Sequence, residues 1–194
     1  MSTPPIYVIR HGETEWNRAG RMQGIMDSPL TETGIAQSKS ICGVLAQLGI
    51  TKDGFDFWCS PQLRAIHTAE LVLAELGVTA QPDDLLGEIS VGQWSGLTRA
   101  EINANWPPTD PHEHFLDFYA RAPDGDSFDV MWDRVGQVLG KVKRPTIIIT
   151  HGITSRFLRT RAMGYGLDQL QIVPGGQGVI NAVIDKKHKV FAPF

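Results

Sequence analysis

The architecture can be inferred most directly from Thr146-Ile147-Ile148-Ile149-Thr150-His151-Gly152. Its isoleucines lie between threonines and form the most strand-like segment of the chain, short and apolar enough for a strand buried on both faces. Near the N-terminus, Ile6-Tyr7-Val8-Ile9 runs into Arg10-His11-Gly12 and repeats the design, an apolar run that ends in His-Gly. We therefore expect two buried strands, each with a histidine at its end.

Helical patterns separate these strands from further ones. Thr31 is a candidate cap for a helix that reaches Leu48, and Ser60-Pro61 is typical of an N-cap followed by proline at the first helical position. The buried face expected for this second helix consists of Leu63, Ile66, Leu73 and Leu76. The other predicted elements are a strand over 55–59, helices over 128–142 and 153–163, and a C-terminal hairpin with strands at 179–184 and 189–191. Strands separated by helices predict a three-layer α/β fold, in which a mostly parallel central sheet has helices on both faces and the hairpin adds an antiparallel edge.

The length of 194 residues indicates a single domain over 1–194. Residues 87–126 differ from the rest because prolines interrupt them and aromatic side chains are scattered through them. We expect an excursion over the sheet edge, with short helices near 98–105 and 112–121. Segments of this kind often serve as lids.

Composition excludes several classes of protein. Lys and Arg number 18 and Asp and Glu 21, a net charge of −3, so no broad basic field is present for nucleic acid or an anionic membrane. No apolar run approaches the ~20 residues of a membrane span, and the N-terminus resembles no signal peptide, which favours a cytoplasmic enzyme. Cys42 and Cys59 are expected to be reduced and buried. Apolar residues from Val190 to Phe194 would suit a homodimer contact.

The candidate chemistry lies where the predicted strands end. In a parallel sheet, His11 and His151 would lie on the same carboxyl edge, where ligands bind. Arg10 precedes one histidine, and Arg64 lies on the helix after Ser60-Pro61, so two guanidinium groups can converge there. Guanidinium groups donate paired hydrogen bonds to a phosphoryl dianion and repel a metal cation, so we predict a phosphoryl site without metal or other cofactor. A histidine held against that group can act as a nucleophile.

These residues belong to a longer pattern. Arg10-His11-Gly12-Glu13-Thr14-Glu15-Trp16-Asn17 resembles the signature of the histidine phosphatase superfamily, whose fold is the phosphoglycerate mutase-like one. The resemblance continues in order along the chain, through Gln23-Gly24, Asp27-Ser28-Pro29-Leu30-Thr31, Gly34, Ser60-Pro61-Gln62-Leu63-Arg64-Ala65, Thr68-Ala69 and Thr150-His151-Gly152.

The resemblance implies a role for each matched residue. His11 would be the nucleophile that becomes phosphohistidine, and Arg10, Arg64 and His151, in its charged form, would bind the phosphoryl oxygens and neutralise developing charge. Glu88, in the segment Leu85-Leu86-Gly87-Glu88, would protonate the leaving oxygen and then activate water. The remaining substrate-binding positions would be Asn17, Gln23, Gly24 and Gly152. Glu13 and Glu15 are the rival acids, although a place in a loop beside the nucleophile fits solvation better.

Three functions remain open at this point. The first is hydrolysis of a small phosphorylated metabolite through a phosphohistidine, as in the small phosphatases of the superfamily. The second is a cofactor-dependent phosphoglycerate mutase, in which Arg99 and Arg121 would be candidates to bind a carboxylate. Those mutases carry Arg and Tyr where this chain has Ile89 and Val91, which favours the phosphatase. The third is a non-catalytic phosphate-binding module. This function is disfavoured because all of the charged and catalytic positions are present: His11, Arg64, Glu88 and His151.

His112 and His114 lack further ligands at metal-binding spacing, so we interpret them as surface residues.

Overall fold

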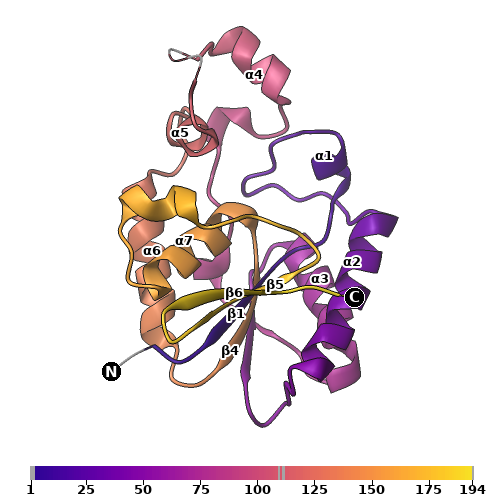
Figure 1. The fold of residues 1–194 in the computed structure, drawn as a ribbon. Coiled ribbons are helices and arrows are strands. Elements are labelled where there is room, and N and C mark those ends of the chain that lie inside the picture. Colours follow the sequence, from indigo (N-terminus) through magenta and orange to yellow (C-terminus); the bar gives the residue numbers. More distant parts are fainter. Residues whose placement is uncertain (1–2, 109, 111, 194) are drawn as a thin grey trace.

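Both His-Gly strands lie at the centre of a six-stranded sheet (Figure 1). A computed structural model describes residues 3–108, 110 and 112–193. The strand order is β3 (Gln81–Pro82), β2 (Asp56–Cys59), β4 (Thr146–Thr150), β1 (Ile6–Arg10), β5 (Ile180–Ile184) and β6 (Lys187–Phe191). The pairs β3–β2, β2–β4 and β4–β1 are parallel, whereas β1–β5 and β5–β6 are antiparallel. The parallel sheet with an antiparallel C-terminal edge is thus confirmed.

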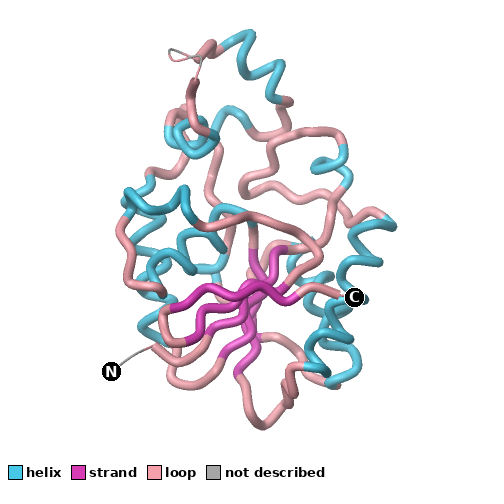
Figure 2. Tube along the Cα trace, viewed as in Figure 1, coloured by secondary structure: helices cyan, strands magenta, loops and turns pink. Residues whose placement is uncertain are grey.

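Helices cover both faces of this sheet, and strands occupy the middle of the molecule (Figures 1 and 2). On one face lie α2 (Glu32–Gln47) and α3 (Leu63–Leu73), and on the other lie α6 (Phe128–Lys141) and α7 (Gly152–Ala162). All five residues of β4 are buried. Ile147 and Ile149 pack into the core beneath α2 and α3, while Ile148 packs into the core beneath α6 and α7. The three-layer prediction is confirmed, because alternate side chains of one strand build two cores.

The start of α3 differs from the prediction. The helix begins at Leu63, and its N-cap residue, Gln62, makes no side-chain capping bond. Leu63 is 69% exposed and is not part of the buried face, which is formed by residues such as Ala65, Ala69 and Val72. Residue 63 precedes residue 65 by about 200° of helical rotation, so the two side chains point in nearly opposite directions.

The C-terminal hairpin has a tighter turn than the sequence suggested. Asp185 and Lys186 have φ values of 49° and 60° and make the whole connection between β5 and β6. Positive φ at both positions is the geometry of a two-residue type I′ turn, which matches the twist of the strands. His188, expected in the turn, therefore lies in β6.

Cys42 and Cys59 are free and buried, as predicted.

A 3-10 helix at Asp84–Leu86 precedes the excursion, which itself carries a 3-10 helix at Gly92–Trp94, followed by α4 (Arg99–Asn105) and α5 (Phe115–Ala120). Its aromatic side chains form a packed cluster. Trp94 is fully buried, and its ring stacks on Phe118 with centroids 4.5 Å apart. This cluster joins the core beneath α6 and α7, so α4 and α5 are anchored above the sheet edge (Figure 1). A lid function for residues 87–126 stays a prediction.

The shorter elements are α1 (Glu15–Arg18) and 3-10 helices at Ala74–Leu76 and Leu167–Ile172. Within the described ranges, no helix combines the length and apolar character needed to cross a bilayer. Val190, at the C-terminal edge, is 50% exposed, whereas Phe194 lies outside the described residues. The homodimer expectation stays a prediction.

Candidate active site

The two histidines meet at the carboxyl edge of the sheet, as expected. β1 and β4 are paired in register from Ile6 with Thr146 to Arg10 with Thr150, so the two strands end at the same level of the sheet. The backbone N–H of His11 donates to the Thr150 carbonyl at 2.9 Å. The rings of His11 and His151 then lie 5.2 Å apart, centroid to centroid. Two strands far apart in sequence therefore deliver both imidazoles to one site.

His11 is held in one tautomer. Its Nδ1 lies 2.8 Å from the carbonyl oxygen of Gly12. A carbonyl can only accept, so Nδ1 carries the ring proton and the lone pair remains on Nε2. Burial, together with the neighbouring guanidinium groups of Arg10 and Arg64, holds the pKa of His11 well below its ordinary value of 6.5. The ring is thus neutral at pH 7, with Nε2 available as a nucleophile.

Gly12 fixes the position of this loop by its lack of a side chain. A Cβ at residue 12 would lie 2.4 Å from the backbone oxygen of Gly34, at the start of α2. The Gly12 N–H donates to the Thr68 hydroxyl at 3.0 Å. The nucleophile loop therefore packs directly on the backbone of one helix and bonds to a side chain of another.

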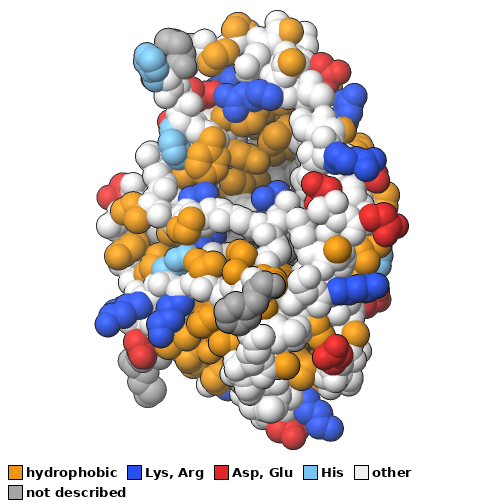
Figure 3. All heavy atoms as spheres, turned by 45° about the vertical axis from the view of Figure 1, so that its right-hand side comes forward, with side chains coloured by type: hydrophobic (Ala, Val, Ile, Leu, Met, Phe, Trp, Pro, Cys, Tyr) orange, Lys and Arg blue, Asp and Glu red, His pale blue; other side chains and the backbone are white. Residues whose placement is uncertain are grey.

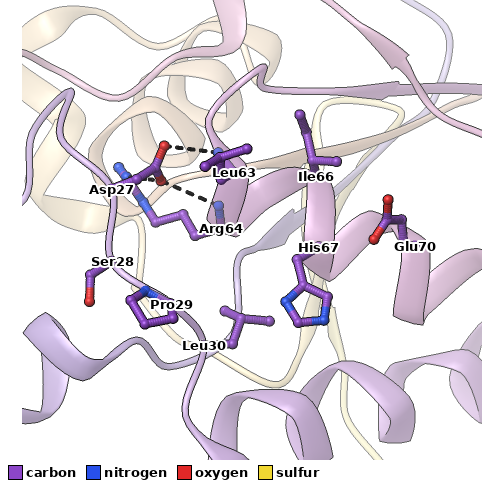
Figure 4. A pocket seen from close by; sticks show the side chains of 9 residues that line it. All are labelled: Asp27, Ser28, Pro29, Leu30, Leu63, Arg64, Ile66, His67 and Glu70. Carbon is purple, nitrogen blue, oxygen red and sulfur yellow. Dashed lines mark hydrogen bonds and ion pairs between the residues drawn. The ribbon is translucent and has the colours of Figure 1, made fainter.

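Arg64 is buried, and acceptors hold it from one side (Figure 4). Its Nη1 donates to the Met26 carbonyl at 2.6 Å and to the Asp27 carboxylate at 2.8 Å, and its Nη2 donates to the Gly24 carbonyl at 2.8 Å. Asp27 also accepts from the backbone N–H of Leu63 at 2.9 Å. One carboxylate thus caps α3, which Gln62 does not, and fixes the direction of the Arg64 side chain.

Three nitrogens beside His11 are buried and have no hydrogen-bond partner among the described residues: Arg10 Nε, Arg64 Nε and His151 Nδ1. Both Nε atoms are obligatory donors. The Ser60 hydroxyl has one proton and two acceptors within reach, His151 Nε2 at 2.7 Å and Gln62 Oε1 at 3.4 Å. Donation along the shorter contact leaves the ring proton of His151 on Nδ1. Buried donors without partners are rare in folded proteins and call for a missing acceptor. An oxyanion placed against His11 would supply one.

The surroundings of His151 disfavour its charged form. The residue is fully buried. Burial is the main cause that lowers the pKa of His151 well below 6.5, and repulsion from a proton on His11 and from the guanidinium groups of Arg64 and Arg10 lowers it further. The two arginines therefore supply the positive charge of the site, and the charged form of His151 that the resemblance implies stays a prediction.

Glu88 reaches the same edge from the loop after β3. Its Oε1 accepts from the backbone N–H and the hydroxyl of Thr154, at 3.1 and 3.0 Å, while its Oε2 accepts from the N–H of Ile153 at 3.1 Å. These donors belong to the first turn of α7, where the helix dipole favours a carboxylate. Because Oε2 has a single partner, it is the oxygen free to exchange a proton.

Three of the other predicted substrate-binding residues, Asn17, Gln23 and Gly24, lie around one cavity. This cavity, of about 240 Å³, is lined by His11, Arg10, Arg64 and Glu88 together with Asn17, Gln23, Gly24 and Tyr119. Asn17 Oδ1 is already occupied, accepting from Thr14 N–H and Gln177 Nε2, so Asn17 can offer only its amide N–H groups to a ligand. Gly24, at φ +52°, packs against Val91. Gly152 lines an adjoining cavity on the far side of Arg10. The space-filling view shows a hollow in the upper half of the molecule with basic side chains at its rim (Figure 3).

A larger cavity of about 440 Å³ lies behind Arg64, between α3 and the segment Asp27–Leu30 (Figure 4). His11, which lines the smaller cavity, does not line this one, and much of its wall is apolar. His67 lines it from an exposed position. We therefore place the candidate chemistry in the smaller, charged cavity.

The rival acids lie elsewhere. Glu13 accepts a hydrogen bond from the Thr31 hydroxyl at 2.8 Å, and Glu15 forms an ion pair with Arg18. Arg99 and Arg121 both pair with Glu113, so neither is free to bind a carboxylate in this arrangement.

Several residues of the site were not predicted. Asp27 and Ser60 belong to the matched motifs, but no local pattern indicated that they orient Arg64 and His151. Tyr119 comes from α5, and no local pattern links that helix to the sheet edge. Burial raises the pKa of Tyr119 to about 12, with Glu88 as the next cause, so its hydroxyl stays a neutral donor.

Comparison with known proteins agrees with this geometry. The family model of the histidine phosphatase superfamily (branch 1) matches residues 6–190. The chain belongs to this superfamily. A 2,3-bisphosphoglycerate-dependent phosphoglycerate mutase from Bradyrhizobium sp. is 31% identical over 81% of this chain and 80% of its own length. Phosphoserine phosphatase 1 from Hydrogenobacter thermophilus is 27% identical over 84% and 78%. The solved structure of YhfR from Bacillus stearothermophilus superimposes with a TM-score of 0.76 at 29% identity, covering 97% of this chain and 96% of that one.

The burial of His11 and His151 predicts how the free energy of unfolding depends on pH. Unfolding exposes His11 and His151, whose pKa values rise to about 6.5, so below that pH the unfolded chain binds more protons than the folded one. The free energy of unfolding should therefore fall as the pH drops from 7 to 5, by up to about 2.7 kcal/mol per pH unit for two protons. Urea unfolding across this range measures the slope, and a His11→Gln/His151→Gln double variant should flatten it. Equal slopes in both proteins would contradict the conclusion that His11 and His151 are neutral in the folded protein.

The Asp27 contact predicts a loss of activity without loss of fold. Asp27→Asn keeps an oxygen for the α3 backbone but removes the charge opposite Arg64. A hydrogen bond to a charged group contributes about 1.5–3 kcal/mol, so kcat/KM for a phosphomonoester should fall about 10- to 100-fold. Asp56→Asn is the matched control, since Asp56 pairs with Arg144 at 3.5 Å at the opposite end of β2. A loss of equal size in both variants would show that Asp27 has no specific role in the site.

Proposed function

We propose that this protein is a phosphomonoesterase that hydrolyses a small phosphorylated metabolite through a phosphohistidine at His11. The observation that carries the proposal is a set of three buried nitrogens near Nε2 of His11 that have no hydrogen-bond partner among the described residues: Arg10 Nε, Arg64 Nε and His151 Nδ1. A tetrahedral dianion is the ligand that such convergent donors fit. A cavity of about 240 Å³ suits a small substrate.

In the first step, Nε2 of His11 attacks phosphorus and forms the P–N bond while the bond from phosphorus to the leaving oxygen breaks. Arg10 and Arg64 neutralise charge on the equatorial oxygens, which is the main contribution a protein makes to phosphoryl transfer. Glu88 gives its proton to the leaving alkoxide. A covalent histidine thereby divides one difficult displacement into two easier ones.

In the second step, Glu88 removes a proton from water, the water oxygen bonds to phosphorus, and the P–N bond breaks. His11 returns to its neutral form with Nδ1 still bonded to the Gly12 carbonyl. The two arginines supply the positive charge that a metal would otherwise contribute, so the proposed reaction needs neither metal nor organic cofactor. We further propose that it takes place in the cytoplasm.

The residues after Glu88 favour hydrolysis over isomerisation. Ile89 and Val91 stand where the mutases described above carry Arg and Tyr, and both are buried apolar side chains. A mutase must also bind the substrate carboxylate and protect the phosphohistidine from water. Arg99 and Arg121, the residues considered above for that carboxylate, are both engaged with Glu113.

Phosphate release and isomerisation separate the two functions. With 3-phosphoglycerate and a trace of 2,3-bisphosphoglycerate, we expect little 2-phosphoglycerate compared with the phosphate released from the best substrate of a phosphorylated-metabolite panel. Phosphorus NMR follows both products in one sample, with His11→Ala as the blank. Isomerisation much faster than any hydrolysis would make the protein a mutase instead.

A further inference from the structure

A second, smaller cavity adjoins the one that holds His11. Its volume is about 110 Å³, and it shares Arg10, Glu88 and Tyr119 with the first cavity. Its remaining wall is formed by the start of α7 and by the turn at Gly175–Gly176. His11 does not line it, so a group bound there would not react.

Two arginines of α7 make this second cavity strongly positive. Arg156 is 7% exposed and Arg159 is 1% exposed. Within the described part of the chain, neither forms an ion pair with a carboxylate: Arg156 Nη1 donates to the carbonyls of Leu170 and Val173, and Arg159 Nη2 donates to the Pro174 carbonyl. Buried charge without a counter-charge is costly, and an anion in the cavity would offset that cost.

Burial and repulsion from Arg156 both act on the pKa of Arg159. Burial is the main cause that lowers the pKa of Arg159 to about 9, and the neighbouring Arg156 lowers it further. Glu88, the carboxylate on this wall, is engaged with the first turn of α7 through both of its oxygens. The positive charge at Arg156 therefore remains available to a ligand.

Donors also remain free on this wall. Arg156 Nε and Nη2 have no hydrogen-bond partner among the described residues, while the stack of its guanidinium on the Phe115 ring, 4.8 Å from the centroid, fixes its orientation. A Cβ at residue 175 would lie 3.5 Å from Arg156 Nη2, so backbone without a side chain passes close to the charge. Ser155, which is buried, accepts from Arg159 Nε at 3.1 Å, and its own proton has no acceptor in the described ranges.

We propose that this cavity, defined by Ser155, Arg156 and Gly175–Gly176, binds a second anionic group of the substrate, a carboxylate or a second phosphate. The inference rests on the proposed function, because it assumes that the reacting phosphoryl group lies against His11. Arg10 and Tyr119 border both cavities, so one short molecule can place an anion at each end. The preferred substrates are then phosphomonoesters with a second anionic group, rather than simple alkyl phosphates.

Matched substrate pairs test the proposal. For a carboxylate, the pair is 3-phosphoglycerate and glycerol 3-phosphate, and for a second phosphate it is fructose 1,6-bisphosphate and fructose 6-phosphate. The wild-type protein should show kcat/KM at least about 10-fold higher for the doubly anionic member of one pair, and the pair concerned identifies the group. Arg156→Gln should lose most of this preference and Arg156→Lys should keep part of it, when the rate of each variant on each substrate is divided by its own rate on p-nitrophenyl phosphate.

Arg161→Gln is the control, since Arg161 lies on the same helix, stacks over Trp132 at 5.0 Å and lines neither cavity. It should leave both the preference and the basal rate unchanged. Equal rates on both members of each pair, or an equal loss on all substrates in Arg156→Gln, would overturn the proposal and leave Arg156 as a structural tie to the segment 170–173.

Binding to the His11→Ala protein separates this inference from the proposed function. Calorimetry should show tighter binding of the doubly anionic member of one pair, and Arg156→Gln in the same background should abolish the difference. If that difference is present but the wild-type protein releases no phosphate from any ester, the proposed hydrolysis is wrong and the second anion site stands. If hydrolysis is present without the difference, the inference alone is wrong.

Discussion

Replacing His11 with alanine is expected to lower kcat/KM for p-nitrophenyl phosphate by about 10⁴-fold or more. Loss of a covalent nucleophile costs on the order of 10⁴–10⁶ in rate in enzymes where it has been removed. We expect no second nucleophile to take over. In His151, Nε2 is hydrogen-bonded to the Ser60 hydroxyl and Nδ1 carries the ring proton, so neither nitrogen has a free lone pair for attack. Release of p-nitrophenol over hours measures the residual rate.

The matched control is His67→Ala. His67 lies on α3 in an exposed position, lines the cavity behind Arg64 and does not line the cavity that holds His11. Its loss should leave the rate within about twofold of the wild type, as is usual for surface substitutions. An His11→Ala protein that keeps more than a few per cent of the activity would exclude the covalent route.

Glu88→Gln should separate substrates by their leaving groups. The amide keeps an oxygen for the N–H groups of α7 but cannot give up a proton as a carboxyl group does. An alkoxide leaves poorly without an acid, so rates on sugar phosphates should fall about 10²- to 10⁴-fold. p-Nitrophenol has a pKa of about 7 and leaves unaided, so phosphorylation of His11 by p-nitrophenyl phosphate should be affected far less.

The second half-reaction still lacks its base in this variant. Stopped-flow absorbance should therefore record a burst of p-nitrophenol close to one per active site, followed by a slow steady state in which phosphoenzyme accumulates. Glu13→Gln is the control, because Glu13 bonds to Thr31 and should show no burst. Equal losses of Glu88→Gln on both kinds of substrate, without a burst, would assign Glu88 a structural role only.

The sheet and the histidine pair could be predicted because both follow from local patterns. Isoleucine-rich runs ending in His-Gly specify buried parallel strands, and parallel strands bring their carboxyl ends to one edge. The predicted start of α3 was wrong because the cap comes from Asp27, a residue 36 positions before the Leu63 N–H that it binds. A cap supplied from a distant loop leaves no signal in the sequence around the helix.

The positions of Tyr119 and Arg156 could not be predicted for a similar reason. Tyr119 reaches the cavity because Trp94 and Phe118 pack α5 against the core, and this packing joins segments with no common periodicity. Arg156 occupies a helical position that the sequence alone presents as one basic residue among several on α7. Its burial, and the turn at Gly175–Gly176 that faces it, emerge only when the whole chain is folded.

The phosphohistidine at His11 is the central claim, and trapping it is the most direct test. The wild-type protein and Glu88→Gln should be mixed with a ³²P-labelled phosphomonoester, quenched within milliseconds and digested for mass spectrometry. We expect a label that is stable in base and lost in acid, on the peptide that contains His11, and in larger amount in Glu88→Gln. A label on any other residue, or turnover at full rate with no label in either protein, would contradict the mechanism.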